Sequence, residues 1–245
     1  MSVDYNDKNY DYISYWGNRS YEHNSEVIAL KKLLPKKGKR IIDIGAGFGR
    51  LFPVYESRFK EIILFEPSKK LLEQARDNIN KSTIDKVFFR IGKIPIRDRP
   101  NLGLSLIEYD CVLMVRVVHH LEDLNSAIAS VSKIIKKDGV FILEFANKIH
   151  FLNILKNSAR LNFGFFFTQP YKVGTFILWH PAYVKEVLEK NGFALEKKLS
   201  VSNFRSSLLK KLIPEKILLV LEDCLQKPLS YINFGPSVFV KAVKS

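Results

Sequence analysis

Residues 41–51 constrain the fold most strongly, because a β-branched run there passes directly into a glycine-rich turn. The apolar residues of Ile41-Ile42-Asp43-Ile44 are typical of a buried parallel strand. Gly45-Ala46-Gly47-Phe48-Gly49 follows, with three glycines in five residues. Glycine is needed where the backbone takes a positive φ or where a ligand approaches the main chain closely. The stretch therefore predicts a strand-turn-helix unit with a ligand above the carboxyl end of its strand.

A second apolar run, residues 62–65, ends in Glu66 and Pro67. In folds of this type an acid at that place holds a ribose. Together the glycine turn and Glu66 predict a nucleoside-bearing cofactor across the ends of two adjacent strands.

Two features of the turn distinguish between cofactors. A dinucleotide site has the spacing G-x-G-x-x-G, whereas this turn reads G-x-G-x-G and has Arg50 where the third glycine would stand. Asp43 precedes the first glycine, and its carboxylate would repel a pyrophosphate but attract an ammonium or a sulfonium. The turn thus favours a sulfonium cofactor, with a nicotinamide-binding protein as an alternative.

The rest of the chain alternates strand-like and helix-like segments, which predicts an α/β fold with a doubly wound, mostly parallel sheet. Strands are expected at 62–65, 87–91, 109–115, 140–145, 193–199 and 236–243. Helices are expected at 51–58, at 69–80 with Ser68 as N-cap, from Asp123, at 182–190 with His180 as cap, and within 204–229, and a turn at 136–139.

From Lys39 to Glu144 the order and spacing of these motifs resemble those of class I S-adenosylmethionine-dependent methyltransferases, in the broad small-molecule subgroup. Residues 109–121 resemble the fourth motif of that family and residues 137–144 the fifth. The resemblance implies a Rossmann-like sheet of seven strands with the last strand antiparallel at its edge. It also implies S-adenosylmethionine as cofactor and S-adenosylhomocysteine as product.

The same resemblance implies one domain over residues 1–245. Within it we expect a cofactor-covering segment at 1–38, a cofactor-binding core at 39–145 and helical or aromatic lid inserts at 146–179 and 204–230. The aromatic residues of the first insert can bind an apolar acceptor or pack on their own domain.

The resemblance also assigns the cofactor contacts. Glu66 would hold the ribose and Ile94 would flank the adenine. The family usually has Gly-Asp after the third strand, but here Lys93 follows Gly92, and a lysine cannot accept a hydrogen bond from the adenine amino group. The expected contacts are Tyr15, Arg19, Asp43, Gly45, Ala46, Gly47, Gly49, Glu66, Pro67, Gly92, Lys93, Ile94, Val115 and Arg116. The alternative for Tyr15 and Arg19 is that they belong to a surface segment that packs on the core without contacting the cofactor.

Methyl transfer requires mainly positioning, and a general base only where the acceptor is protonated. The candidates for catalysis are His119, His120, Arg116 and Glu144, of which Arg116 is the sharper lead because it directly follows an apolar strand. The two histidines can instead shape a strand-to-helix junction. Arg116 can hold an acceptor carboxylate or phosphate, or pair with Glu144.

The net charge of +14 is spread over scattered lysine pairs, a pattern typical of a solvated surface rather than of nucleic-acid binding. The polar first residues, the lack of a long apolar segment and the two cysteines predict a cytoplasmic protein without a transmembrane segment, metal site or disulfide framework.

We expect a small-molecule or lipid-like acceptor. RNA or protein methylation, and a non-catalytic S-adenosylmethionine-binding module, are alternatives. The oligomeric state is not assigned by the sequence.

Overall fold

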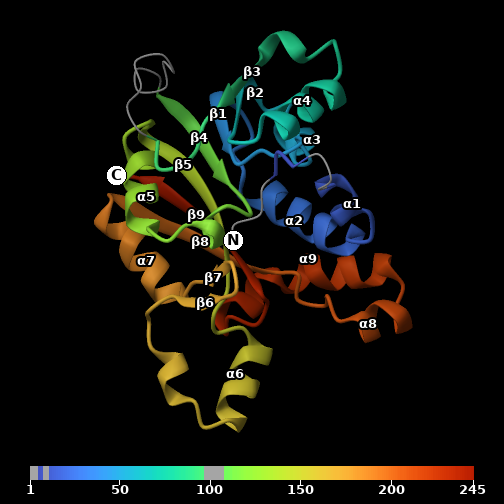
Figure 1. The fold of residues 1–245 in the computed structure, drawn as a ribbon, viewed down its shortest axis with the longest axis vertical. Coiled ribbons are helices and arrows are strands. Elements are labelled where there is room, and N and C mark those ends of the chain that lie inside the picture. Colours follow the sequence, from blue (N-terminus) through green and yellow to red (C-terminus); the bar gives the residue numbers. More distant parts are fainter. Residues whose placement is uncertain (1–4, 8–10, 97–107) are drawn as a thin grey trace.

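A seven-stranded sheet forms the centre of the computed structural model, which describes residues 5–7, 11–96 and 108–245 (Figure 1). The strand order is β3-β2-β1-β4-β5-β9-β8. Strands β1 to β5 are mutually parallel, and β9 is antiparallel to both of its neighbours. The predicted doubly wound, mostly parallel sheet is confirmed. The strands are β1 (Gly38–Ile44), β2 (Phe59–Glu66), β3 (Val87–Ile91), β4 (Tyr109–Met114), β5 (Ile135–Ala146), β8 (Phe193–Val201) and β9 (Ser237–Lys244).

Helices cover both faces of this sheet. Apolar side chains of α5 and α7 pack on one face, and those of α2, α3 and α4 pack on the other. Helix α9 lies against β8 and α2. The helices are α1 (Tyr12–Gly17), α2 (Ser20–Leu33), α3 (Phe52–Tyr55), α4 (Lys69–Asn78), α5 (Leu124–Ser132), α6 (Phe151–Ala159), α7 (Pro181–Lys190), α8 (Ser207–Leu212) and α9 (Glu215–Tyr231). In the part of the chain that the structure describes, none of them is long and apolar enough to cross a bilayer.

The burial of both faces explains why the central strands are apolar at nearly every position. In β1, Ile42 and Ile44 belong to the core under α5 and α7, whereas Ile41 belongs to the core under α2. Helix α4 begins where its N-cap predicts, because the Ser68 hydroxyl accepts a hydrogen bond from the Leu71 amide at 3.2 Å.

The segment between β5 and α7 forms the predicted aromatic insert. It contains α6, the short 3₁₀ helix η4 (Phe163–Phe166) and a hairpin of β6 (Tyr171–Val173) and β7 (Phe176–Leu178). Figure 1 shows α6 and η4 projecting from the lower end of the molecule. The insert is anchored by Trp179, which is 1% exposed and donates its indole N–H to the Val118 carbonyl at 3.0 Å.

Three of the expected elements differ from the structure. The last strand is antiparallel but lies between β5 and β8, so the expectation that it forms the edge is wrong. Its residues 238–240 are at most 1% exposed, whereas the true edge, β8, carries charges at residues 196–198, as suits an edge strand. The turn expected at 136–139 is part of β5, where Asp138 at φ 61° accommodates an irregular register. The helix expected at 51–58 is only the four residues of α3.

A buried carboxylate joins α9 to the rest of the fold. Glu222 is 0% exposed and accepts hydrogen bonds from the Tyr21 hydroxyl at 2.7 Å and from the amides of Ser202 at 2.8 Å and Asn203 at 3.0 Å. Burial raises the pKa of Glu222, and these donors partly offset the effect. Helices α2 and α9 and the turn after β8 therefore depend on one side chain.

We expect Glu222→Ala to lower the free energy of unfolding by about 3 kcal/mol, because it leaves several buried donors without an acceptor. Asp223→Ala is the matched control, since it removes the next acid of the same helix. Asp223 is 57% exposed and pairs with Lys32 on the surface, so its loss should cost less than about 1 kcal/mol. Urea denaturation measures both, and equal losses would contradict the role of Glu222.

Candidate functional site

A cavity of about 470 Å³ opens at the carboxyl ends of β1, β2 and β4. Strands β1 and β4 are neighbours whose connections run to opposite faces of the sheet, which is where doubly wound folds bind ligands. Eight of the residues expected to contact the cofactor line the cavity: Gly45, Gly47, Glu66, Pro67, Gly92, Lys93, Ile94 and Arg116. Tyr5, Tyr12, Leu71 and His120 are among the others. The volume suits a ligand of nucleoside size.

The glycine turn is shaped by its backbone and by Glu66. Gly45 has φ 75°, and a Cβ atom there would overlap the Cγ2 atom of Val117. Gly47 has φ 57° and donates its N–H to Glu66 Oε2 at 2.9 Å, while Ser68 donates its N–H to Glu66 Oε1 at 3.0 Å. The carboxylate that fixes the turn is therefore that of Glu66. Burial raises the pKa of Glu66, and the two amides partly offset this.

Asp43 faces α3 rather than the cavity. Its carboxylate accepts a hydrogen bond from the Tyr55 hydroxyl of α3 at 2.6 Å, and the side chain is 3% exposed. Burial raises the pKa of Asp43 to about 7. In this arrangement Asp43 is not among the residues that line the cavity.

The other expected contacts lie beside the cavity rather than on its lining. Tyr12, one turn before Tyr15 on α1, lines the cavity, whereas Tyr15 is 40% exposed and lies under the Arg19 guanidinium at 4.1 Å. Ala46 and Gly49 belong to the turn, and Val115 is buried in the core under α2. Of the residues that do line the cavity, Lys93 has an exposed side chain, and Ile94 is 8% exposed.

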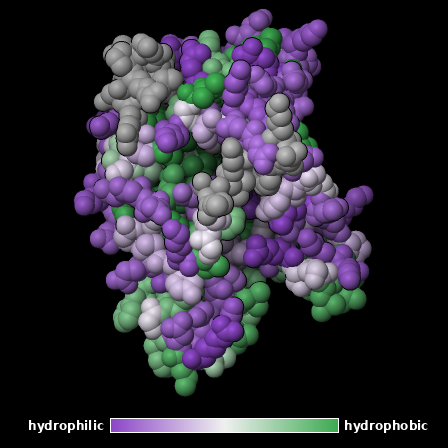
Figure 2. Space-filling view, in the orientation of Figure 1, coloured by the Kyte–Doolittle hydropathy of each residue, from purple (hydrophilic) through white to green (hydrophobic). Residues whose placement is uncertain are grey.

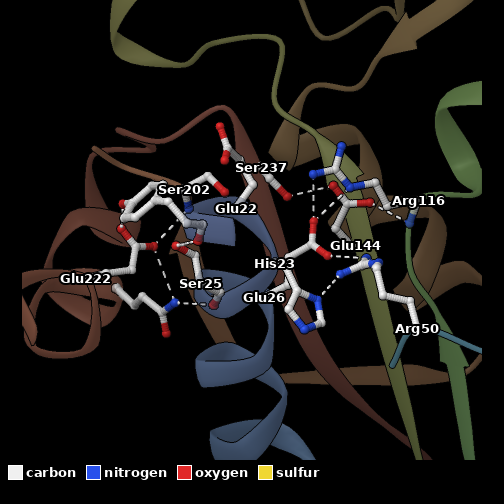
Figure 3. Close-up of polar contacts among 12 residues, drawn as sticks. Glu22, His23, Ser25, Glu26, Arg50, Arg116, Glu144, Ser202, Glu222 and Ser237 are labelled. Atoms are coloured by element: carbon white, nitrogen blue, oxygen red, sulfur yellow. Dashed lines mark hydrogen bonds and ion pairs between the residues drawn. The ribbon is translucent and has the colours of Figure 1, made fainter. Parts of the chain in front are cut away.

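The Glu26 carboxylate ties the turn to the end of β4 (Figure 3). Glu26 is 0% exposed, and it forms ion pairs with Arg50 through Oε2 at 2.5 Å and with Arg116 through Oε1 at 2.6 Å. Both guanidinium groups also lie over the Trp16 ring, at 3.6 Å for Arg50 and 5.0 Å for Arg116. Arg50, which stands where a dinucleotide site has glycine, is thus part of an ion-pair network.

The Arg116 backbone is held in an unusual conformation at the end of β4. Its φ is 62°, a left-handed value that a bulky residue rarely adopts. Its N–H donates to Glu144 Oε2 at 2.8 Å, and Ser237 donates its hydroxyl to Glu144 Oε1 at 2.6 Å. The Arg116 side chain pairs with Glu26, so the expected pairing with Glu144 occurs through the backbone only.

Arg116 also lines a second cavity, of about 500 Å³, together with His119, Glu144 and residues of the aromatic insert. His119 is 9% exposed, and burial, with smaller effects of His120 and Arg116, lowers its pKa to about 3. The ring of Phe176 lies 5.2 Å from that of His119 and 5.4 Å from that of His120. The four candidates for catalysis are divided between the two cavities: His120 lines the first, His119 and Glu144 line the second, and Arg116 lines both.

Several residues of the site are not found by the sequence motifs, among them Tyr12, Trp16 and Glu26. For Glu26 a signal exists. It lies four residues before Leu30 and seven before Leu33, on the buried face of α2. An acid on such a face needs a cationic partner.

A family model described as a methyltransferase domain matches residues 6–198. A Saccharomyces cerevisiae protein described as a probable S-adenosylmethionine-dependent methyltransferase is 31% identical over 144 residues, which are 58% of this chain and 47% of that protein. The ubiquinone biosynthesis O-methyltransferase of Pelagibacter ubique is 25% identical, over 46% of this chain and 45% of that protein. The chain thus matches about half the length of these curated relatives.

Solved structures share the fold over more of the chain. Magnesium protoporphyrin IX methyltransferase from Synechocystis with bound S-adenosylhomocysteine has a TM-score of 0.61 at 18% identity, over 98% of this chain and 91% of that one. An S-adenosylmethionine-dependent methyltransferase from Mesorhizobium loti has a TM-score of 0.59 at 18% identity, over 90% of this chain and 98% of that one. At these identities the likeness concerns the fold.

The raised pKa of Asp43 predicts a pH dependence of stability. Its pKa is about 7 in the folded chain against an ordinary 3.8, so the folded state holds a proton that the unfolded state has lost in this range. The free energy of unfolding should therefore fall between pH 4.5 and pH 7, by about 3 kcal/mol, and Asp43→Asn should remove this part of the fall. Urea denaturation at both pH values measures it.

The control is Asp77→Asn, which changes an exposed acid on α4 and should leave the pH dependence of the wild type unchanged. An equal fall in wild type and Asp43→Asn would contradict the burial of a protonated carboxyl at this position.

Proposed function

Since this chain belongs to the S-adenosylmethionine-dependent methyltransferases of class I, we propose that it transfers a methyl group from S-adenosylmethionine to a small-molecule or lipid-like acceptor. The observation that carries the proposal is the pair of cavities that meet at Arg116. One lies over the glycine turn and Glu66, and the other lies under the aromatic insert. A donor and an acceptor in the two cavities would be brought together at this junction.

The residues around the first cavity fit S-adenosylmethionine, the cofactor of the family. Gly45 and Gly47 leave room for close approach to the main chain, and Glu66 supplies a buried carboxylate that would accept the ribose hydroxyls. Ile94 and Leu71 would pack against the adenine. Since the Lys93 side chain is exposed, the adenine amino group would be met by backbone groups. Tyr12, rather than Tyr15, would cover the cofactor from α1.

When bound, the cofactor supplies a methyl group on a sulfonium that is already an activated leaving group. The protein therefore has to orient the acceptor and exclude water. Arg116 and Glu144 hold each other in place at the junction and would act as positioning residues. His119 is neutral at physiological pH and would accept a hydrogen bond from an acceptor hydroxyl. A group with so low a pKa is a weak base, which favours catalysis by positioning.

Two observations support an acceptor of small-molecule size. The second cavity has the volume of a site for a drug-sized ligand. One relative is named for ubiquinone biosynthesis and one structural neighbour for magnesium protoporphyrin IX. Both names favour a small molecule over RNA or protein as acceptor. A cytoplasmic location stays a prediction.

We expect Glu66→Ala to weaken the binding of S-adenosylhomocysteine at least about tenfold, because hydrogen bonds to a carboxylate contribute about 1.5–3 kcal/mol. Glu61→Ala is the matched control. It removes another acid of β2, one that pairs with Arg40 at 2.5 Å and is partly exposed, and it should leave the affinity unchanged. Isothermal titration calorimetry measures both dissociation constants. Equal affinities of Glu66→Ala and wild type would exclude the proposed ribose contact.

A further inference from the structure

The second cavity is lined by cations that lack an acidic partner. Arg205, Lys156 and Arg160 line it with side chains that are also open to solvent, and none of them forms an ion pair within residues 5–7, 11–96 and 108–245. Arg116 is a fourth cation of the lining. Among the described lining residues the only acid is Glu144, whose oxygens already accept hydrogen bonds. Positive charge in this cavity is therefore in excess.

The electrostatics of neighbouring groups agree with this excess. The Arg205 side chain is exposed, but partial desolvation among its neighbours lowers its pKa, and the charge of Arg116 lowers it further. Burial lowers the pKa of His150 to about 4, with a further contribution from Arg205. Glu22 opposes the effect on Arg205, but its carboxylate pairs with Lys210 at 3.0 Å. The surroundings of the cavity are positively charged, so they repel further cations and favour the binding of an anion.

The cavity is also lined by aromatic residues. Phe165 is 4% exposed and lies edge-on to Tyr171 at 5.0 Å, and Phe176 lies beside His119. Figure 2 shows that hydrophobic surface gathers at the lower end of the molecule, where α6 and η4 project. Residues of this insert include exposed Leu152, Leu155 and Phe163. A ligand of this cavity would thus meet both cationic and apolar groups.

We propose that the second cavity binds an acceptor that carries a carboxylate or phosphate on an apolar body, with Arg205, Lys156 and Arg160 holding the anionic group. The inference rests on the proposed function and names its substrate class. Arg116 and His119 mark the end that adjoins the cofactor cavity, so the methylated atom lies there. Lys156 and Arg160 lie on and just after α6, whereas Arg205 follows β8, so the cations reach the cavity from two segments of the chain.

The test uses the full chain saturated with S-adenosylhomocysteine, and two probes that differ by one group, 1-naphthyl phosphate and 1-naphthol. Calorimetry should show that the phosphate binds the wild type at least about tenfold more tightly than the naphthol, as expected for charge-assisted hydrogen bonds. Arg205→Gln and the double variant Lys156→Gln/Arg160→Gln should each remove most of this preference. Arg205→Lys, which keeps the charge, should retain most of it.

The matched control is the double variant Lys190→Gln/Lys216→Gln, which removes two exposed lysines outside the cavity and should keep the preference. A second arm distinguishes a soluble metabolite from a lipid headgroup by co-sedimentation with phosphatidylglycerol vesicles. Vesicle binding that depends on Arg205 indicates a lipid, and binding of the soluble probe alone indicates a metabolite. Both results support an anionic acceptor.

Equal affinity for the two probes, or an unchanged preference in Arg205→Gln, would overturn the inference. If S-adenosylhomocysteine still binds in that case, the proposed function stands and only the acceptor class is wrong. If the wild type fails to bind S-adenosylhomocysteine, the proposed function fails and the inference fails with it.

Discussion

The site depends on one buried carboxylate, that of Glu26, shared between two guanidinium groups. A carboxylate with no exposed surface is costly unless its charge is compensated. Burial alone would raise the pKa of Glu26, but Arg116 and Arg50 overcome this effect and hold it below its ordinary value. The carboxylate therefore remains charged, and it joins three segments that are far apart in sequence: α2, the end of the glycine turn and the end of β4.

The consequences reach both cavities. Because Glu26 fixes the Arg116 side chain and Glu144 fixes its backbone, the residue that lines both cavities has a defined position. The same guanidinium groups lie over Trp16, which holds α1 beside the glycine turn and brings Tyr12 to the cavity. The cover over the proposed cofactor site and the wall shared with the proposed acceptor site thus share one ion-pair network.

Local patterns in the sequence are sufficient for much of this arrangement. The apolar run before Gly45, the acid at Glu66 and the N-cap at Ser68 are signals carried by neighbouring residues, and the structure has the predicted strand, turn and helix there. The expected ribose contact of Glu66 itself stays a prediction. Contacts that depend on tertiary packing cannot be predicted from such local patterns. Tyr12 and Tyr15 lie one turn apart on α1, and the motif alone does not tell which one reaches the cavity.

The place of β9 illustrates the same limit at the level of the sheet. Its apolar sequence predicts a strand, but the sequence does not indicate which strands it pairs with. In the fold it lies between β5 and β8. The cations of the proposed acceptor site also come from separate parts of the sequence. Arg205 follows β8, whereas Lys156 and Arg160 belong to the insert after β5. Only the fold brings these cations to one cavity. Charge counted along the sequence shows no such concentration, because the lysine pairs are scattered.

The central claim is that donor and acceptor meet at Arg116, the residue that both cavities share. A crystal structure of the full chain with S-adenosylhomocysteine tests this most directly. It should show the ribose against Glu66 and the sulfur facing the Arg116 junction, with the second cavity left free for an acceptor. A complex in which the nucleoside occupies the second cavity, or in which the sulfur faces away from Arg116, would contradict it.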